Sequence, residues 1–231
     1  MKKILSVLAI ALMSTALFAK TWTNNAGFGF TLPISSITSD NEDVNDFFQI
    51  GYGIQGFYLG YHENGFTLKA AESAGLATSK DFYFPDNDTH FGVFNNIEVG
   101  LGYTFIKNNR VTLSLLGMLG LDLSVYSDSE DDTDVLAADN STTVKGDYTI
   151  SIGTALFSVG GDLFVSCKLK PNLGLFCNIS GRYLVAGKAF GEQETKYKTG
   201  DKTITSKEDF GDRDLNGKFR IQPTIGLVWT F

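Results

Sequence analysis

Apolar and polar residues alternate one by one along a stretch that begins near Arg110, and this alternation limits the possible folds more than any other feature. One face of the stretch is entirely apolar and carries Val111, Leu113, Leu115, Leu119, Leu121, Leu123 and Val125. The opposite face is mixed and carries Thr112, Ser114, Leu116, Met118, Gly120, Asp122 and Ser124. Successive side chains of a β-strand point to opposite faces, so the stretch predicts a strand longer than most strands of soluble sheets.

Seven further segments follow the same period of two, which predicts about eight strands in total. Together with the stretch already described, which is 110–125, the eight segments in chain order are 22–34, 47–61, 66–76, 91–105, 110–125, 148–169, 173–190 and 218–231. The parity of the second segment is blurred near Gly56. That of the sixth changes around Gly160 and Gly161, which predicts a β-bulge.

The connections between these segments alternate in length. Short turns are predicted at 62–65, 107–109 and 170–172, and long polar loops near 35–46, 77–89, 127–146 and 191–216. The last loop contains a hairpin of its own around Gly200 and Asp201, so the strands can also be counted as ten. Eight strands with this pattern place both termini and all short turns at one end. This layout predicts an all-β fold, a closed antiparallel up-and-down transmembrane barrel with four long extracellular loops.

The distribution of charge favours lipid over water around this barrel. A soluble barrel needs charged residues on its outer face, whereas the less apolar faces here are rich in Gly, Ser, Thr and Asn, and the charges gather in the loops. A closed barrel also pairs every backbone N–H and C=O, as hydrocarbon requires. The net charge of −7 and the absence of a basic stripe argue against nucleic acid as a partner.

The N-terminus is typical of a secretory signal peptide. Lys2 and Lys3 precede the apolar run 4–12, and the small residues of 16–19 offer a cleavage site. The run is too short to span a membrane as a helix. The sequence therefore predicts a signal peptide at 1–19, export from the cytoplasm, and a barrel domain at 20–231.

The C-terminus ends in Thr224, Gly226, Trp229 and Phe231, spaced as a polar residue, a glycine two residues later, and aromatics at the third-last and last positions. This pattern resembles the β-signal of outer-membrane barrels. Together with the strand layout, the mature chain resembles the small OmpA-, OmpX- and OmpW-type barrels, and also the small barrel proteins of spirochaetes. The resemblance implies a place in the bacterial outer membrane, with its lipid and the barrel-assembly machinery as partners.

Five charged residues are predicted to point into the lumen: Lys69, Glu98, Asp122, Arg182 and Arg220. Buried charges of both signs are tolerated only in pairs. Eight-stranded barrels are also usually filled by side chains. The sequence therefore predicts a polar, ion-paired plug, with a gated path for protons or solutes as the alternative.

Two cysteines, Cys167 and Cys177, flank the turn at 170–172 symmetrically and share the outward face. They can lie opposite each other on adjacent strands, so a disulfide is one prediction. The other is a pair of small apolar residues facing lipid, because disulfide geometry is demanding.

Other motifs are weaker. The glycines of 51–56 match the letters of a dinucleotide fingerprint but continue into a strand instead of a helix, so no cofactor is predicted. His90, near Asp86, Asp88 and Thr89, is the one candidate catalytic residue, and no nucleophile signature accompanies it. The alternating carboxylates of the acidic loops could gather Ca²⁺, but Thr133 stands where a calcium loop requires glycine. The loops are therefore interpreted as a solvated anionic surface with weak binding of divalent ions, and no metal site is predicted.

Three functions remain open. The first is a structural or surface-interaction barrel whose acidic loops contact ligands, as exposed loops on rigid scaffolds commonly do. The second is a narrow channel for small apolar molecules, which the OmpW resemblance implies. The third, and least favoured, is an outer-membrane enzyme that modifies lipid or peptide through His90.

Overall fold

The structure, a computed structural model, describes residues 21–39, 47–80, 89–108, 110–136, 143–199, 202–209 and 211–231. The predicted signal peptide lies outside these residues. These described residues form ten strands: β1 (Trp22–Thr31), β2 (Ile34–Ser39), β3 (Phe47–His62), β4 (Phe66–Lys80), β5 (Thr89–Lys107), β6 (Val111–Leu136), β7 (Thr143–Lys170), β8 (Leu173–Thr199), β9 (Lys202–Asp209) and β10 (Arg213–Thr230). No described segment is a helix long and apolar enough to cross a membrane.

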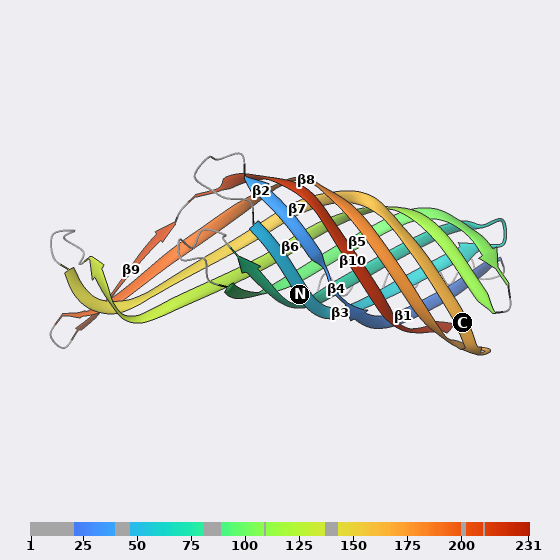
Figure 1. Ribbon diagram of the computed structural model, residues 1–231, viewed down its shortest axis with the longest axis horizontal. Helices are drawn as coiled ribbons and strands as arrows, with labels where there is room; N and C mark the ends of the chain where they lie inside the picture. Colours follow the sequence, from blue (N-terminus) through green and yellow to red (C-terminus); the bar gives the residue numbers. More distant parts are fainter. Residues whose placement is uncertain are drawn as a thin grey trace.

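All the strands except β9 take part in one antiparallel ring (Figure 1). Each strand from β3 to β8 pairs with the next along the chain, and β8 also pairs with β10. β10 pairs with both β1 and β2, and both of these pair with β3, which closes the ring. β1 and β2 therefore share one of eight strand positions. They are separated at Leu32 and Pro33, where proline has no N–H for the ladder. The predicted closed antiparallel barrel of eight strands is confirmed.

The register shows that the strands are staggered around the ring. A path along paired residues that starts at Leu59 passes every strand position and returns to β3 at Gln49, ten residues away on the same strand. Closure with such an offset requires strands that tilt by roughly 35–45° from the barrel axis. The tilt is visible in Figure 1, where the strands wind obliquely around the barrel.

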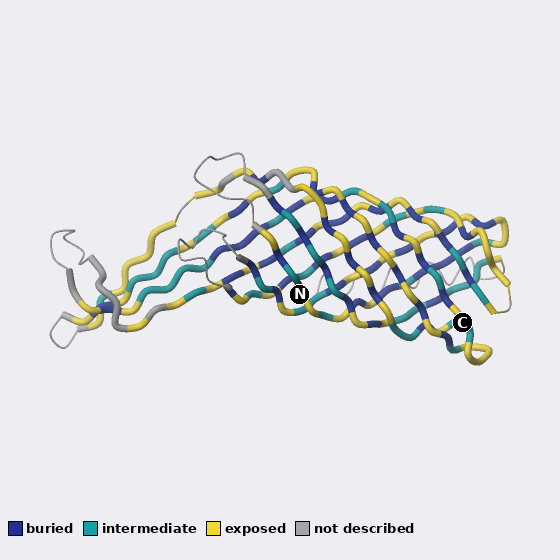
Figure 2. Tube along the Cα trace, in the orientation of Figure 1, coloured by how far each residue is buried: buried dark blue, intermediate teal, exposed yellow. Residues whose placement is uncertain are grey.

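Buried and exposed residues alternate along each barrel strand, as Figure 2 shows. On β6 the predicted faces are confirmed, because the residues from Thr112 to Ser124 at even positions are all buried. The outer surface is dominated by apolar and aromatic side chains, among them Phe28, Phe30, Ile54, Phe91, Leu101, Leu119, Ile179 and Ile225. Such a surface is stable in hydrocarbon and unstable in water.

Two predictions about parity are wrong. β3 keeps one parity throughout, because Gln55, Phe57 and Leu59 are all buried; the pattern looked blurred because apolar side chains occupy both of its faces. The bulge is on β8, where Ser158 pairs with Leu184 and Phe157 with Ala186, leaving one extra residue between. Because glycine has no side chain, Gly160 and Gly161 do not indicate which face of β7 points inward.

The short turns lie between β3 and β4, β5 and β6, and β7 and β8, as predicted. In the first, Gly65 adopts a φ of 98°, which favours glycine, and its N–H donates to the carbonyl of His62 at 2.8 Å. In the second, Asn108 Oδ1 accepts hydrogen bonds from the N–H groups of Arg110 and Val111 at 2.9 and 2.7 Å.

The predicted loops at 127–146 and 191–216 are mostly strand. β6 continues to Leu136 and β7 begins at Thr143, and the upper part of β8 forms a hairpin with β9, as predicted around Gly200. Figure 1 shows these four strands continuing beyond the ring at the end opposite the C-terminus. We call this part, residues 127–136, 143–152, 191–199 and 202–209, the projecting sheet. The polar side chains of these segments had indicated loops. A strand that is surrounded by water needs no apolar face, so a polar sequence can also form a strand.

Candidate functional site in the barrel interior

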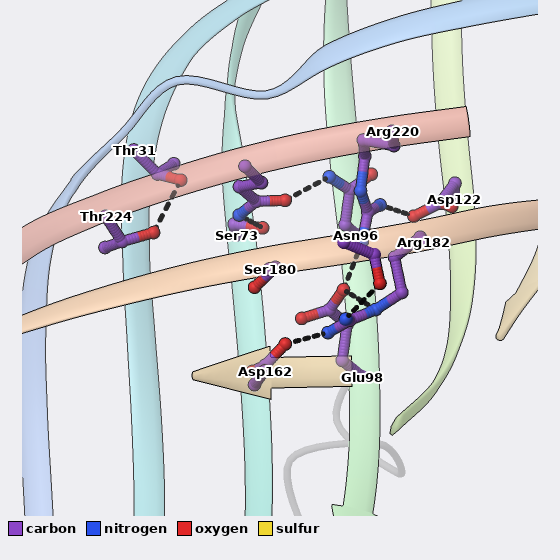
Figure 3. Close-up of polar contacts among 12 residues, drawn as sticks. Thr31, Ser73, Asn96, Glu98, Asp122, Asp162, Ser180, Arg182, Arg220 and Thr224 are labelled. Atoms are coloured by element: carbon purple, nitrogen blue, oxygen red, sulfur yellow. Dashed lines mark hydrogen bonds and ion pairs between the residues drawn. The ribbon is translucent and has the colours of Figure 1, made fainter. Parts of the chain in front are cut away.

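Six charged side chains form one continuous chain of ion pairs inside the barrel. Figure 3 shows the part of this chain that runs from Asp162 to Asp122. Their charges alternate in the order Lys69, Asp162, Arg182, Glu98, Arg220 and Asp122. Each residue comes from a different strand, and all six are buried. Three cations and three anions cancel, so the chain of ion pairs carries no net charge.

The contacts within the chain are close. Lys69 Nζ lies 2.6 Å from Asp162 Oδ2, and Arg182 Nη2 lies 2.6 Å from Asp162 Oδ1. Arg182 Nε lies 3.1 Å from Glu98 Oε1. Arg220 completes the chain through two guanidinium nitrogens, one on Glu98 and one on Asp122. The planar guanidinium suits this bridging position, because it presents several donors in a fixed geometry.

Neutral polar side chains support both ends of the chain. Lys69 Nζ also donates to Asn178 Oδ1 at 3.1 Å, and Asn178 Nδ2 donates to Ser180 Oγ at 2.9 Å. At the other end Asn96 fits between Asp122 and Arg220. With its amide nitrogen toward Asp122, it donates at 3.2 Å and its oxygen accepts from Arg220 at 3.0 Å. Such bonds matter because a buried charge is tolerated only when its remaining donors and acceptors are also satisfied.

Apolar side chains fill the interior on the side of the short turns. Phe57, Phe164 and Phe176 form a cluster with ring centroids 4.7 to 5.7 Å apart. Lys69 Nζ lies 5.7 Å from the centroid of Phe57 and 5.8 Å from that of Phe164, within the range of a cation–π contact. Leu59, Leu116, Met118 and Val228 extend this cluster.

A second apolar group lies toward the projecting sheet. It contains Ile37, Ile152, Leu156, Leu184, Ala189 and Leu215, with Phe94 and Tyr126 nearby on β5 and β6. A cavity lined by some of these residues, by Asp122 and by Arg220 has room for about one water molecule. The sequence predicts a polar, ion-paired plug, and the structure places the charged chain between two apolar groups that the prediction does not include.

The five residues predicted to point inward are all in the chain of ion pairs, and the prediction missed Asp162. A parity change at Gly160 and Gly161 would turn Asp162 outward. The burial of Ser158, Asp162 and Phe164 shows instead that the alternation is uninterrupted. An unbroken period of two through the two glycines is the signal that would have found the sixth member.

The prediction that Cys167 and Cys177 lie opposite each other is wrong. Cys167 pairs with Leu175, and Cys177 pairs with Val165, because the β7–β8 register is offset by two residues from the symmetric one. Both cysteines are free and exposed on the outer face. They act there as small apolar side chains facing lipid.

His90 is buried at the upper end of β5, with Nδ1 3.3 Å from Asp128 Oδ2. Its cross-strand partner is Ser79, whose Oγ makes no hydrogen bond to any described residue. A nucleophile and its base need such a bond, so Ser79 and His90 do not form a nucleophile–base pair in the described part of the chain. Asp86 and Asp88 lie outside the described residues, as does the acidic part of the first loop. Among the described residues no cluster of His, Cys, Asp or Glu is suited to hold a metal ion.

The four residues of the C-terminal pattern lie along β10 and at its end. Thr224 points inward and shares a hydrogen bond with Thr31 at 2.9 Å. A Cβ on Gly226 would lie 2.2 Å from the carbonyl oxygen of Phe28, so the neighbouring strand leaves room for glycine alone. Trp229 stacks on Phe28 at 5.6 Å, and Phe231 is exposed. Their role in assembly stays a prediction.

No protein-family model and no curated protein matches the chain. Solved structures do match. A major outer membrane protein from Thermus thermophilus is 11% identical with a TM-score of 0.51, over 89% of this chain and 99% of that chain. The fold is that of a small outer-membrane β-barrel. With its apolar exterior, the chain is an integral outer-membrane protein.

Two further matches are more distant in structure. Neisserial surface protein A is 11% identical with a TM-score of 0.43, over 91% of this chain and 97% of that chain. Ail of Yersinia pestis, solved in complex with the heparin analogue sucrose octasulfate, is 11% identical with a TM-score of 0.42, over 91% of this chain and 99% of that chain. Similarity at this level says nothing about the role of this outer-membrane barrel.

Proposed function

We propose that the protein is a surface-interaction barrel, which holds the projecting sheet above the outer membrane so that the sheet can contact extracellular ligands. The continuation of β6, β7 and β8 beyond the ring, with β9 added, carries this proposal. A barrel that needed only to span the membrane would not require strands of 26 to 28 residues.

The filled interior supports a role at the surface over transport. The charged chain crosses the lumen through six strands, and apolar side chains pack on both sides of it. A solute would have to break ion pairs and displace packed aromatic rings. The cavity beside Asp122 and Arg220 is too small to hold more than about one water molecule.

The projecting sheet offers two kinds of recognition. Its surface carries charges of both signs. The exposed Lys207 Nζ lies 2.5 Å from the exposed Glu192 Oε1 and 3.0 Å from Oε2 of the half-buried Glu194. Its outer strand β9 pairs with β8 alone among the described strands, so one edge retains backbone donors and acceptors. Extended peptides bind such edges by adding a strand, and charged rims set the orientation.

An adhesion assay tests the proposal. Bacteria that display the protein would be applied to wells coated with heparin, laminin or collagen. The test variant replaces residues 194–207 by a two-residue turn, and Cys177→Ser serves as a matched change on the barrel wall. Heat-dependent gel mobility would show that each barrel is folded.

We expect binding to at least one coating that the shortened variant loses and Cys177→Ser retains. Protease added to intact cells should also cleave at Lys196, Lys198 or Lys202 and leave the barrel whole. If the shortened variant bound every coating as the unmodified protein does, or if these lysines resisted protease until the cells were broken, the proposal would be overturned.

A further inference from the structure

A carboxylate lies on the lipid-facing wall of the barrel, where apolar residues are expected. Glu72 is on β4 and exposed, within the outward series Phe66, Leu68, Ala70, Glu72, Ala74 and Leu76. Outward aromatic residues lie on both sides of it, Tyr103 toward the short turns and Tyr52 toward the projecting sheet. Glu72 is therefore in the middle of the apolar band. Charged groups at this depth are costly and usually functional.

Glu72 shares this position with one other polar side chain. Asn95 of β5 donates from Nδ2 to Glu72 Oε1 at 2.9 Å, across the outer face of the two strands. Among the described residues this is the one hydrogen bond that either side chain makes. An amide has two donors and an acceptor, and a carboxylate has two oxygens. The pair thus retains both donors and acceptors for an external partner.

The residues that surround Glu72 and Asn95 on the outer face of the barrel have small side chains. The direct cross-strand partner of Glu72 on β3 is Gly56, and a Cβ there would have no heavy atom within 4 Å. Ala70 and Ala74 flank Glu72 along β4. Small residues around a polar side chain allow two membrane-embedded surfaces to approach closely and hydrogen-bond, since lipid tails offer no polar partner.

We propose that the outer face of β3, β4 and β5 around Glu72 and Asn95 binds a second copy of this chain. Two copies inserted in the same direction can be related by a twofold axis along the membrane normal, so residues at equal depth meet. The face is self-complementary in that arrangement, because the Asn95 amide of each copy can donate to the Glu72 carboxylate of the other. The proposal is independent of the role of the projecting sheet.

Cysteine cross-linking in lipid bilayers tests this pairing. The test protein carries Ala74→Cys in a background with Cys167→Ser and Cys177→Ser, and copper phenanthroline supplies the oxidant for the disulfide. The unmodified protein is the matched control: its two cysteines lie on β7 and β8, on the side of the ring opposite β4. Heat-dependent gel mobility confirms folding in every case.

We expect a disulfide-linked dimer from the Ala74→Cys protein and none from the unmodified protein. Adding Glu72→Leu and Asn95→Leu should reduce the dimer yield. In single-molecule photobleaching of labelled protein at increasing lipid dilution, the same two changes should raise the dissociation constant roughly tenfold. A folded Ala74→Cys protein that stays monomeric at all dilutions would overturn the proposal. So would equal cross-linking through the native cysteines, or a dissociation constant that the two changes leave unaltered.

Discussion

Ion pairs occur in two parts of this molecule, and the two sets differ in what their loss costs. In the barrel interior, each charge of the chain from Lys69 to Asp122 is buried among other side chains. In the projecting sheet, Glu192 and Lys207 are more than half exposed. Removing a buried partner leaves a charge without compensation, whereas water replaces an exposed one. Loss of one partner is therefore expected to destabilise the fold strongly in the barrel interior and only slightly in the projecting sheet.

The largest effect is expected at the middle of the buried chain. Arg182→Met leaves both Asp162 and Glu98 without one of their partners, and should destabilise the barrel by about 3–5 kcal/mol or prevent folding. Lys69→Met removes a terminal member and leaves Asp162 paired with Arg182, so it should cost less. Urea unfolding in lipid vesicles, followed by gel mobility, measures both. Equal costs for the two variants would show that the chain does not act as a connected unit.

A packing change should have an intermediate effect. In Gly226→Val the new Cβ meets the carbonyl oxygen of Phe28, and we expect a loss of about 1–3 kcal/mol through displaced backbone. Gly181→Val is the matched control on β8, because a Cβ there has no heavy atom within 4 Å. The same unfolding assay compares them. If both variants were equally stable, the close approach of β1 and β10 would not be a constraint on the sequence.

The smallest effect is expected on acidification, which should destabilise the projecting sheet and leave the barrel unchanged. A hydrogen bond from Lys196, followed by one from Lys207, lowers the pKa of Glu194 below its ordinary value of 4.5. A lowered pKa means that these contacts stabilise the sheet fully above pH 4.5 and lose this effect as the pH falls through the folded-state pKa. Hydrogen exchange at low pH should therefore rise in β8 and β9 above the ring. Glu194→Gln should abolish that pH dependence without changing exchange in the barrel strands.

The sequence alone predicted those strands in which the polarity of each side chain indicates whether it faces the lumen or the lipid. On β5 and β6 the alternation is continuous, and it placed Glu98 and Asp122 inside correctly. It failed where side chains are missing or ambiguous. Two consecutive glycines on β7 hid the direction of Asp162, and β3 carries apolar residues on both faces, which hid Phe57 and its cluster.

The sequence also did not predict which residues pair across neighbouring strands. Cys167 and Cys177 were expected to face each other from their symmetric spacing, but the register of the β7–β8 turn shifted each by two positions. The charged interior residues could be identified individually. Their order in the chain of ion pairs depends on the stagger of ten residues around the ring, which no single strand reveals.

Ion conductance through the purified protein in a planar lipid bilayer measures whether the lumen of the barrel is closed. We expect a current no different from that of the lipid alone, because the neutral chain of ion pairs and the apolar groups on both sides of it close the lumen. Discrete current steps would contradict this expectation, above all if Glu98→Gln changed their preference between cations and anions. That result would identify the interior as a conducting path and make the projecting sheet secondary.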